Sequence, residues 1–334
     1  DANRYRMTDD EEAYLEKYGT VAYLVIQDDS IRYEEYREDW TPQKLSNIFS
    51  ATKSIVGLLV GIAYDEGFIE SLDDKVSKYL PEFGEGDKIT IRNLLTMSSG
   101  LDWDEAYTAL ISKTTGDRIR DLIMDLKVVE EPGKKYSYKS GDTQLLSFVL
   151  EAALDKVHKE KEYEWGIFKT EVKVHSPESI SEYAERKLWK PLGACNDALW
   201  NLDREDGDEK TYCCFNTTAR DLARLGRLIL NKGNWNGRQL ISETYLNEAI
   251  TPAGYLENEF GDGSLDYYGF QIWIMHYKEM RFPAFRGLGG QYMFVIPQKK
   301  AIVIRLGHKR SDEYIREKTI DMDAYLDIAF KILE

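Results

Sequence analysis

Two stretches near opposite ends of the chain show the pattern of short apolar runs and turn formers that is typical of β-hairpins. In the first, TVAYLVIQDDSIRYEEYRE (residues 20–38), two runs rich in β-branched and aromatic residues flank the turn former DDS. In the second, QYMFVIPQKKAIVIRLGH (residues 291–308), two similar runs flank PQKK. The pattern therefore predicts a sheet to which both ends of the sequence contribute.

Between the two hairpins, apolar side chains recur at the intervals of a helix. This spacing predicts helices over residues 51–66, 91–99, 117–127, 141–155, 179–189 and 217–231. A short acidic helix is expected over Asp9–Lys17, and an amphipathic helix over Glu313–Leu333 is expected to close the chain. The middle of the sequence is thus predicted to be mainly helical.

These elements predict an α+β fold, an α/β sandwich in which an antiparallel sheet formed by both termini is flanked by helices. A mainly helical subdomain is expected to be inserted into this sandwich. The expected boundaries place residues 1–72 and 215–334 in the subdomain with the sheet, and residues 73–214 in the helical subdomain. The active site is expected in the cleft between the two subdomains.

Composition and charge limit the classes of partner. Of the 334 residues, 43% are hydrophobic, which is enough for a large core in one domain or two closely packed ones. A formal net charge of -15 at pH 7 argues against binding to nucleic acid or to an anionic membrane surface. The longest apolar stretch, Ile55–Ala63, is too short to cross a bilayer, so no transmembrane segment is expected.

The cysteines and histidines give no support to a metal site. Cys195, Cys213 and Cys214 are too few and too unevenly spaced for a disulfide framework. The adjacent pair, Cys213 and Cys214, is expected to consist of small buried hydrophobic residues and to have no redox role. Neither CxxC nor HExxH occurs, and the four histidines are scattered, so neither a metal nor an organic cofactor is expected.

The most hydrophobic predicted helix begins within FSATKSIVGLLVGIAYDEG (residues 49–67), where a serine and a lysine stand three residues apart. On a helix, Ser50 and Lys53 share one side, and Lys53 faces the apolar stripe, on which Gly57 and Gly61 leave room for a neighbouring element. In one interpretation, Ser50 caps the helix and Lys53 extends to solvent. In the other, burial favours the neutral form of Lys53, which takes the proton of the Ser50 hydroxyl and makes it a nucleophile.

A second motif lies in EEPGKKYSYKSGDTQLLSFVLEAA (residues 130–153), directly before another predicted helix. The combination of S-A-T-K at the start of a buried helix and PG-x-x-Y-S-Y-K-S before a second helix resembles the serine β-lactamase and penicillin-binding-protein superfamily. The similarity is greatest to its class C, esterase and 6-aminohexanoate-dimer-hydrolase branches. LDDKVSKYLPEF, ITIRNLLTMSSGLDW, NTTARDLARLGRLILNKGNWNGRQLIS and GLGGQYMFVIP extend the resemblance over roughly residues 20–330. It implies a β-lactamase/transpeptidase-like fold.

The resemblance assigns roles to the residues of the first two motifs. Ser50 matches the acylated nucleophile of the family and Lys53 its general base. Tyr138 matches the tyrosine of the Tyr-x-Asn motif, which relays a proton to the leaving group or activates the hydrolytic water. Ser140 stands where that motif usually has asparagine, and its hydroxyl can hydrogen-bond Lys53 or a substrate amide.

The third motif departs from the family pattern. Where many relatives have Lys-Thr-Gly or His-x-Gly, this chain reads Leu288-Gly289-Gly290. The resemblance implies that the second donor of the oxyanion hole follows Gly290. The backbone N–H groups of Ser50 and Gln291 are therefore expected to hold the oxyanion.

Leu288 also bears on the choice of substrate. A leucine supplies no cation for the carboxylate of a β-lactam, so slow or undetectable β-lactam hydrolysis is expected, with activity on small neutral esters or linear amides. Arg286, two residues upstream, is an alternative source of that charge, although its expected place is a solvated rim.

Two aromatic residues, Trp103 and Tyr107, are weaker candidates for the site. In MSSGLDWDEAY they occupy the place where relatives of the dimer hydrolase carry aromatic side chains over the cleft. Tyr107 could then hydrogen-bond a substrate amide. Alternatively, a Trp and a Tyr four residues apart on a helix are both core residues.

The sequence therefore predicts a serine hydrolase, an esterase or amidase, that cleaves a small-molecule ester, amide or peptide-like substrate through a Ser50 acyl-enzyme. A monomer is expected. The alternatives are a true β-lactamase or D,D-peptidase, or a non-catalytic penicillin-binding or sensor domain. An α/β-hydrolase would require a G-x-S-x-G elbow, which the chain lacks. If a leader was removed before Asp1, the expected location is periplasmic or secreted, and otherwise cytoplasmic.

Overall fold

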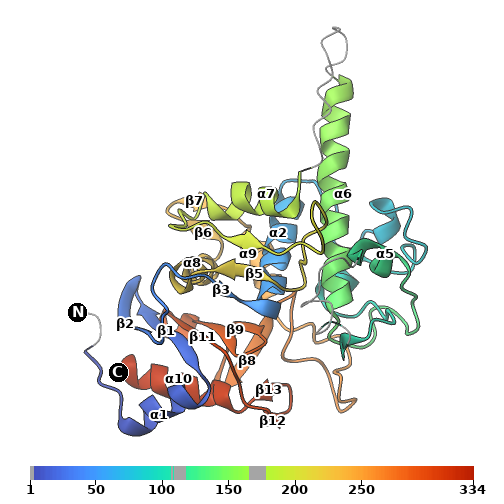
Figure 1. Ribbon diagram of the computed structural model, residues 1–334. Helices are drawn as coiled ribbons and strands as arrows, with labels where there is room; N and C mark the ends of the chain where they lie inside the picture. Colours follow the sequence, from blue (N-terminus) through green and yellow to red (C-terminus); the bar gives the residue numbers. More distant parts are fainter. Residues whose placement is uncertain (1–3, 107, 109–117, 165–177) are drawn as a thin grey trace.

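A computed structural model describes residues 4–106, 108, 118–164 and 178–334 of the chain. Its centre is a six-stranded antiparallel sheet with the strand order β2-β1-β11-β10-β9-β8 (Figure 1). In that order the strands are Ser30–Tyr36, Thr20–Gln27, Ala301–Gly307, Gln291–Ile296, Met280–Gly287 and Trp273–Tyr277. The predicted antiparallel sheet from both ends of the chain is confirmed, because β1 pairs with β11.

The sequence pattern did not predict β8 and β9. In β9 the run contains Pro283, and a proline within a run of apolar residues argues against a strand because it cannot donate a ladder hydrogen bond. The segment is nevertheless a strand, because β9 lies between β10 and β8 and pairs with both.

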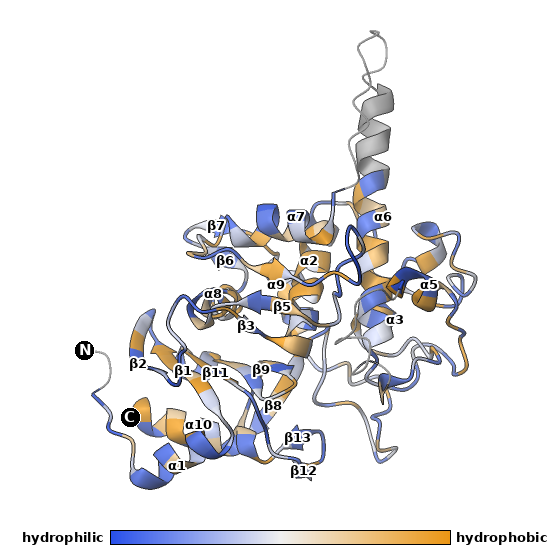
Figure 2. Ribbon diagram, in the orientation of Figure 1, coloured by the Kyte–Doolittle hydropathy of each residue, from blue (hydrophilic) through white to orange (hydrophobic). Residues whose placement is uncertain are grey.

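Each face of the sheet is covered by helices. On one face, α1 (Asp9–Lys17) and α10 (Asp321–Ile332) pack on side chains such as Tyr23 and Phe294. On the other, α2 (Thr52–Asp65) and α8 (Ala219–Leu230) belong to a larger core that includes Leu24. Figure 2 shows the apolar character of α2, which the fold encloses. Successive side chains of β1 therefore belong to two separate cores, one on each face of the sheet.

Three of the remaining helices lie within predicted ranges and are shorter than predicted, the long helix runs past its predicted end at residue 155, and the helix over residues 243–249 was not predicted. These helices are α3 (Ile91–Leu95), α5 (Ile119–Met124), α6 (Ser140–Glu164), α7 (Ile180–Ala184, continued by a π-helical turn Glu185–Trp189) and α9 (Glu243–Ala249). Single 3-10 turns span Phe49–Ala51, Val76–Lys78 and Pro297–Lys299. Side-chain caps at Thr90, Ser179 and Thr218 fix where three of the helices begin. The last turns of α6 rise away from the body of the molecule (Figure 1).

Short strands complete the fold. β3 (Ser46–Asn47) and β4 (Leu199–Trp200) flank β5 (Phe215–Thr217), and β6 (Asn234–Trp235) pairs with β7 (Arg238–Gln239).

The division of the chain at residues 72 and 215 stays a prediction. No helix in the described ranges is both long enough and apolar enough to cross a membrane.

The start of the C-terminal helix was predicted wrongly. Residues 314–319 form a hairpin of β12 (Tyr314–Ile315) and β13 (Lys318–Thr319), and the helix begins only at Asp321. Arg316 has a left-handed backbone (φ 56°), and Tyr314 and Ile315 are exposed. Because no core covers the side chains of Tyr314 and Ile315, these apolar residues do not support a helix there.

Two glycines let neighbouring elements approach α2, as predicted. A Cβ on Gly57 would lie 2.9 Å from the Phe270 carbonyl oxygen, and one on Gly61 would lie 2.3 Å from the Tyr245 ring. Tyr245 in turn donates a hydrogen bond to the Gly57 carbonyl at 2.7 Å. The helix that follows Ser50 is therefore held tightly on two sides.

Candidate active site

Ser50 lies on the 3-10 turn Phe49–Ala51 that leads into α2. The residue before it, Phe49, has φ 46°, an uncommon backbone conformation for an aromatic residue and one that often marks a functional site. The Phe49 N–H donates to Asn47 Oδ1 at 2.8 Å, and the Ala51 N–H donates to the Ile48 carbonyl at 3.1 Å. These bonds fix the turn that presents the Ser50 hydroxyl.

Lys53, in the first turn of α2, is almost completely buried, with 1% of its surface exposed. Its Nζ donates to the Tyr212 carbonyl oxygen at 2.7 Å and lies 3.3 Å from Ser50 Oγ. The interpretation of Lys53 as a solvent-exposed residue is therefore wrong. The geometry brings an amine to the hydroxyl that it would have to deprotonate.

Tyr138 approaches Lys53 through its ring, whose centroid is 4.9 Å from Nζ. The ring also packs against Trp273, with 5.4 Å between centroids. Among the described residues, its hydroxyl makes no hydrogen bond to Ser50 or Lys53. Tyr138 and Ser50 do line the same cavity, which leaves the hydroxyl available to a substrate.

Ser140 does not contact Lys53. It is fully buried at the start of α6, where its Oγ donates to Glu105 Oε1 and its N–H donates to Glu105 Oε2, both at 2.7 Å. The expected contact to Lys53 or a substrate amide is thus replaced by a helix cap. Glu105 was not predicted, although an acid at a helix N-terminus is a common arrangement.

The third motif divides into a cavity part and a structural part. Gly289 and Gly290 have φ 73° and 80°, and their carbonyls both accept from the buried Arg305 guanidinium at 2.8 Å. Gln291 is 3% exposed, and its amide group donates to the Leu288 and Gly307 carbonyls. These three residues hold a turn together and are not among those that line the cavity, so the Gln291 N–H as an oxyanion donor stays a prediction.

Gly287 and Leu288 form the cavity part of this motif. A Cβ on Gly287 would lie 2.1 Å from the Ile48 carbonyl oxygen, so only glycine lets the end of β9 pass the turn that carries Ser50. Leu288 follows directly and is 47% exposed. In the described part of the chain its N–H has no backbone acceptor.

The cavity has a volume of about 520 Å³ and collects side chains from distant segments. Ser50, Tyr138 and Leu288 lie on its wall with Cys213 and Trp273. Its charged lining consists of Glu105, Glu259, Arg286, Arg310, Arg316 and Glu317. Ser50, Tyr138 and Leu288 thus line one cavity, and the buried Lys53 amine lies 3.3 Å from the Ser50 hydroxyl, an arrangement that suits acyl transfer.

The family model described as Beta-lactamase matches residues 8–325. The chain belongs to this family. It is 26% identical to a 6-aminohexanoate-dimer hydrolase from Paenarthrobacter ureafaciens, over 89% of this chain and 74% of that protein. The protein is therefore a hydrolase of the β-lactamase fold, in agreement with the resemblance seen in the sequence.

Solved structures show the same fold. A Bacillus anthracis protein described as a 6-aminohexanoate-dimer hydrolase matches with a TM-score of 0.77 and 21% identity, over 96% of this chain and 80% of that one. The D-amino acid amidase of Ochrobactrum anthropi SV3 matches with a TM-score of 0.67 and 14% identity, over 97% and 98%.

Arg286 was expected on a solvated rim, and the structure corrects this. The side chain is 8% exposed and lines the cavity of this beta-lactamase-family protein. Its guanidinium lies over the Trp273 ring at 4.0 Å. Burial lowers the pKa of Arg286 below its ordinary value.

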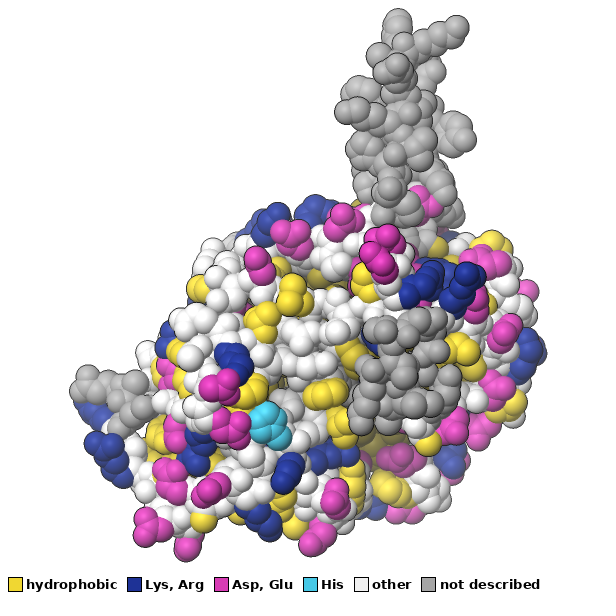
Figure 3. Space-filling view, viewed as in Figure 1, with side chains coloured by type: hydrophobic (Ala, Val, Ile, Leu, Met, Phe, Trp, Pro, Cys, Tyr) yellow, Lys and Arg dark blue, Asp and Glu magenta, His cyan; other side chains and the backbone are white. Residues whose placement is uncertain are grey.

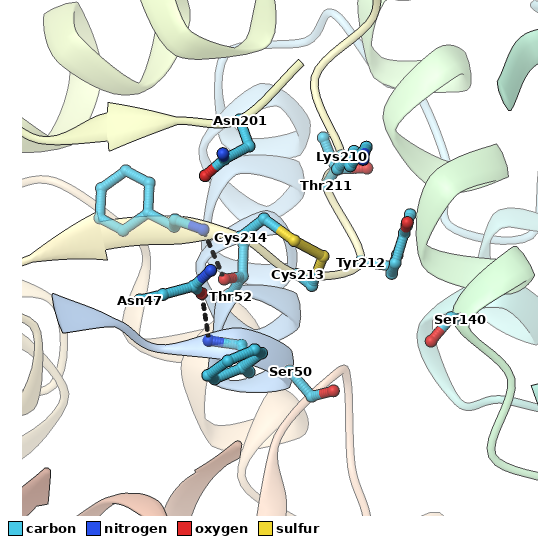
Figure 4. The surroundings of a disulfide bond; sticks show 12 residues. Asn47, Ser50, Thr52, Ser140, Asn201, Lys210, Thr211, Tyr212, Cys213 and Cys214 are labelled. Atoms are coloured by element: carbon cyan, nitrogen blue, oxygen red, sulfur yellow. Dashed lines mark hydrogen bonds between the residues drawn. A yellow bond between two sulfur atoms is a disulfide. The ribbon is translucent and has the colours of Figure 1, made fainter. Parts of the chain in front are cut away.

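Cys213 and Cys214 are buried, as expected, but they also form a disulfide between adjacent residues (Figure 4). Cys213 lines the cavity, and Cys214 has φ 73°. In the sequence, nothing beyond the adjacency of the two cysteines indicated this pairing. Because Tyr212 directly precedes the pair, the crosslink lies next to the carbonyl that holds Lys53.

The two weaker aromatic candidates have different outcomes. Trp103 is buried, packs on Gly141 and donates to Thr108 Oγ1 at 2.8 Å, so it is a core residue behind the cavity wall. Tyr107 lies outside the described residues.

Within the described ranges, no three His, Cys, Asp or Glu side chains gather where they could hold a metal ion.

Proposed function

We propose that this protein is a serine hydrolase that cleaves an ester or amide through a Ser50 acyl-enzyme. One observation carries the proposal: the buried Lys53 Nζ lies 3.3 Å from Ser50 Oγ, at the wall of a cavity that also contains Tyr138. At that distance the amine can accept the proton of the hydroxyl as Ser50 attacks.

In the proposed reaction, Ser50 Oγ attacks the carbonyl carbon and its proton passes to Lys53. The resulting oxyanion accepts hydrogen bonds from the N–H groups of Ser50 and Leu288. We assign the second donor to Leu288 in place of Gln291, because Leu288 lies on the cavity wall one residue after the close contact of Gly287. The proton held by Lys53 is relayed through Tyr138 to the leaving group as the ester or amide bond breaks. Water then attacks the acyl-enzyme ester, one of its protons returns to Ser50 Oγ through the same groups, and the acid is released.

Linear esters and amides are the proposed substrates ahead of β-lactams. A β-lactam holds its carboxylate beside the scissile amide, and at that place the third motif offers Leu288, an apolar side chain. Losing one charge-assisted hydrogen bond there is worth about ten- to a hundredfold in kcat/KM. Penicillin turnover comparable with that of the best ester would contradict this preference.

The test is intact-protein mass spectrometry with a fluorophosphonate, together with turnover of p-nitrophenyl butyrate. Ser50→Ala is expected to remove labelling and to lower kcat about a thousandfold or more. Ser54→Ala is the matched control, since its hydroxyl lies on the same helix but donates to the Gln271 carbonyl at 2.6 Å. Labelling that persists in Ser50→Ala would overturn the proposal, and a single acylation without turnover would identify a non-catalytic binding domain.

A further inference from the structure

Three exposed apolar side chains gather on the wall of the active-site cavity. Phe260, Leu288 and Tyr314, which we call the apolar rim, line the cavity and are 45%, 47% and 51% exposed. They come from three separate segments: the loop before β8, the residue after β9 and strand β12. Single exposed apolar residues are common on protein surfaces, but a group of them around one cavity marks a place where a ligand or a partner binds.

The protein holds the two aromatic rings of this rim in place. The Arg316 guanidinium lies 4.9 Å from the centre of the Phe260 ring, and that of Arg310 lies 5.5 Å from the centre of the Tyr314 ring. Arg310 also donates to the Tyr314 hydroxyl at 2.6 Å. Rings that are already ordered lose little conformational entropy when a ligand packs on them, so the rim is suited to binding.

An ion pair joins the two segments that carry these rings. Arg316 lies between β12 and β13 and pairs with Asp262, two residues after Phe260, at 2.9 Å. The buried Asn258 donates to Asp262 Oδ1 at 2.8 Å and accepts from the Phe260 N–H at 3.0 Å. The hairpin and the loop are therefore linked to each other where they line the cavity.

The charged side chains of the cavity wall balance one another. They are three carboxylates and three guanidinium groups, so their formal charges cancel: Glu105, Glu259, Glu317, Arg286, Arg310 and Arg316. Glu317 and Glu259 both interact electrostatically with Arg286. The described residues of the wall thus present no net charge that would select an ionic substrate.

We propose that the apolar rim binds an uncharged, apolar tail of the substrate, such as an alkyl chain or an aromatic ring. Leu288 connects the rim to the reaction centre, because its backbone N–H is the proposed second oxyanion donor and its side chain belongs to the rim. A tail on either side of the scissile bond can therefore extend from Ser50 across Leu288 toward the two rings. The substrate class is then a neutral ester or linear amide of an apolar acid, alcohol or amine. This inference rests on the proposed function.

The experiment compares neutral esters that differ only in the length of an apolar chain. One pair varies the acyl group, p-nitrophenyl butyrate against p-nitrophenyl octanoate, both kept below the concentration at which the octanoate aggregates. The other pair varies the leaving group, ethyl acetate against hexyl acetate. Each fully buried methylene group is worth about fourfold in kcat/KM. Because the rim buries the added methylene groups only in part, the longer member of at least one pair should be favoured by about tenfold or more.

Phe260→Ala and Tyr314→Ala should each lower this long-to-short ratio by about threefold or more, because each removes apolar surface from the rim, and either one serves if the other fails to fold. Tyr314→Phe keeps the ring and should keep the ratio within about twofold, which separates contact with the ring from the hydrogen bond to Arg310. Leu199→Ala is the matched control, since this side chain is also exposed but lies on β4, outside the cavity wall. Thermal unfolding of each variant confirms that it is folded.

The outcomes separate the two proposals. Ester cleavage with no preference for the longer member of either pair, or an unchanged ratio in both alanine variants, would overturn the role of the rim and leave the hydrolase intact. Alanine variants that change the sedimentation velocity of the protein and not the ratio would show that a second copy of the chain covers the rim, which also overturns the proposal.

If no ester is cleaved, the proposed function fails, and calorimetric titration with octanamide then decides the role of the rim independently. Weaker octanamide binding to Phe260→Ala than to the natural protein supports the proposal. Equal binding to both proteins, or binding to neither, overturns it.

Discussion

At the residue scale, Lys53 and Tyr138 divide the proposed proton transfers between them. Lys53 Nζ is held by the Tyr212 carbonyl at 2.7 Å, so its position relative to Ser50 does not depend on a bound substrate. Within the described ranges the Tyr138 hydroxyl makes no such bond to Ser50 or Lys53, and we propose that it acts on the leaving group. The first residue therefore acts on the nucleophile and the second on the substrate.

Tyr138→Phe should consequently lower kcat by about a hundredfold or more, with a much smaller change in KM. Tyr268→Phe is a matched control, because that ring lies 6.3 Å from the Tyr138 ring and its buried hydroxyl has no partner in the described part of the chain. Steady-state kinetics on p-nitrophenyl butyrate measure both variants. A kcat for Tyr138→Phe that matches Tyr268→Phe would remove Tyr138 from the mechanism.

At the scale of elements, the segment from Asn201 to Phe215 carries the disulfide and is hydrogen-bonded to helix α2. The Asn201 N–H donates to the Cys214 carbonyl at 3.1 Å. The Phe215 N–H donates to Thr52 Oγ1 at 3.2 Å (Figure 4). Between these bonds lies the Tyr212 carbonyl that accepts from Lys53. The crosslink therefore restrains the segment at the point where it positions the amine.

Full reduction of the disulfide should lower kcat about tenfold, because the carbonyl that orients Lys53 gains freedom. Thiol titration in denaturant should count one free thiol, from Cys195, before reduction and all three cysteines afterwards. Cys195→Ser should respond to reduction as the natural protein does. An unchanged kcat in protein that titrates as fully reduced would show that the crosslink does not position Lys53.

At the scale of the whole molecule, charge is spread over the surface. Acidic and basic side chains alternate on the face shown in Figure 3, and many form exposed pairs such as Arg227 with Asp29. Exposed pairs of this kind contribute little to stability. The buried carboxylates have a larger effect on stability than these exposed pairs. The expectation of a monomer stays a prediction.

Asp142 is the clearest of these buried carboxylates. It is fully buried in the first turn of α6, where its Oδ1 accepts from Ser99 Oγ at 2.6 Å and its Oδ2 has no described partner. Burial raises the pKa of Asp142 to about 7. Between pH 4 and 7 the folded protein therefore binds more protons at this site than the unfolded chain, so the free energy of unfolding falls as the pH rises through this range.

Asp142→Asn should remove this dependence while it keeps an acceptor for Ser99. The unfolding free energy of the variant relative to that of the natural protein should rise by about 1.4 kcal/mol per pH unit from pH 4 to pH 7 and then level off. Its relative melting temperature should rise over the same range. Thermal unfolding followed by circular dichroism at several pH values measures this. A difference between the two proteins that does not change with pH would refute the assignment.

The sequence by itself determined the features that depend on near neighbours. The hairpin strands β1, β2, β10 and β11 follow from short apolar runs around tight turns, and α2 follows from its apolar periodicity. The proximity of Ser50 and Lys53 could be predicted because residues three positions apart lie on the same side of a helical turn. Such features form from residues close in sequence, so pattern and turn chemistry are enough to predict them.

Only the tertiary structure decided what each side chain meets across the fold. Ser140 binds Glu105 because helix α6 starts beside it, and Leu288 replaces Gln291 at the cavity because Gly287 passes against Ile48. The burial of Arg286 depends on a hairpin where the sequence pattern predicted a helix. These contacts join segments that are far apart in the chain, and their partners are fixed by the packing of sheet, helices and loops together, which no local pattern records.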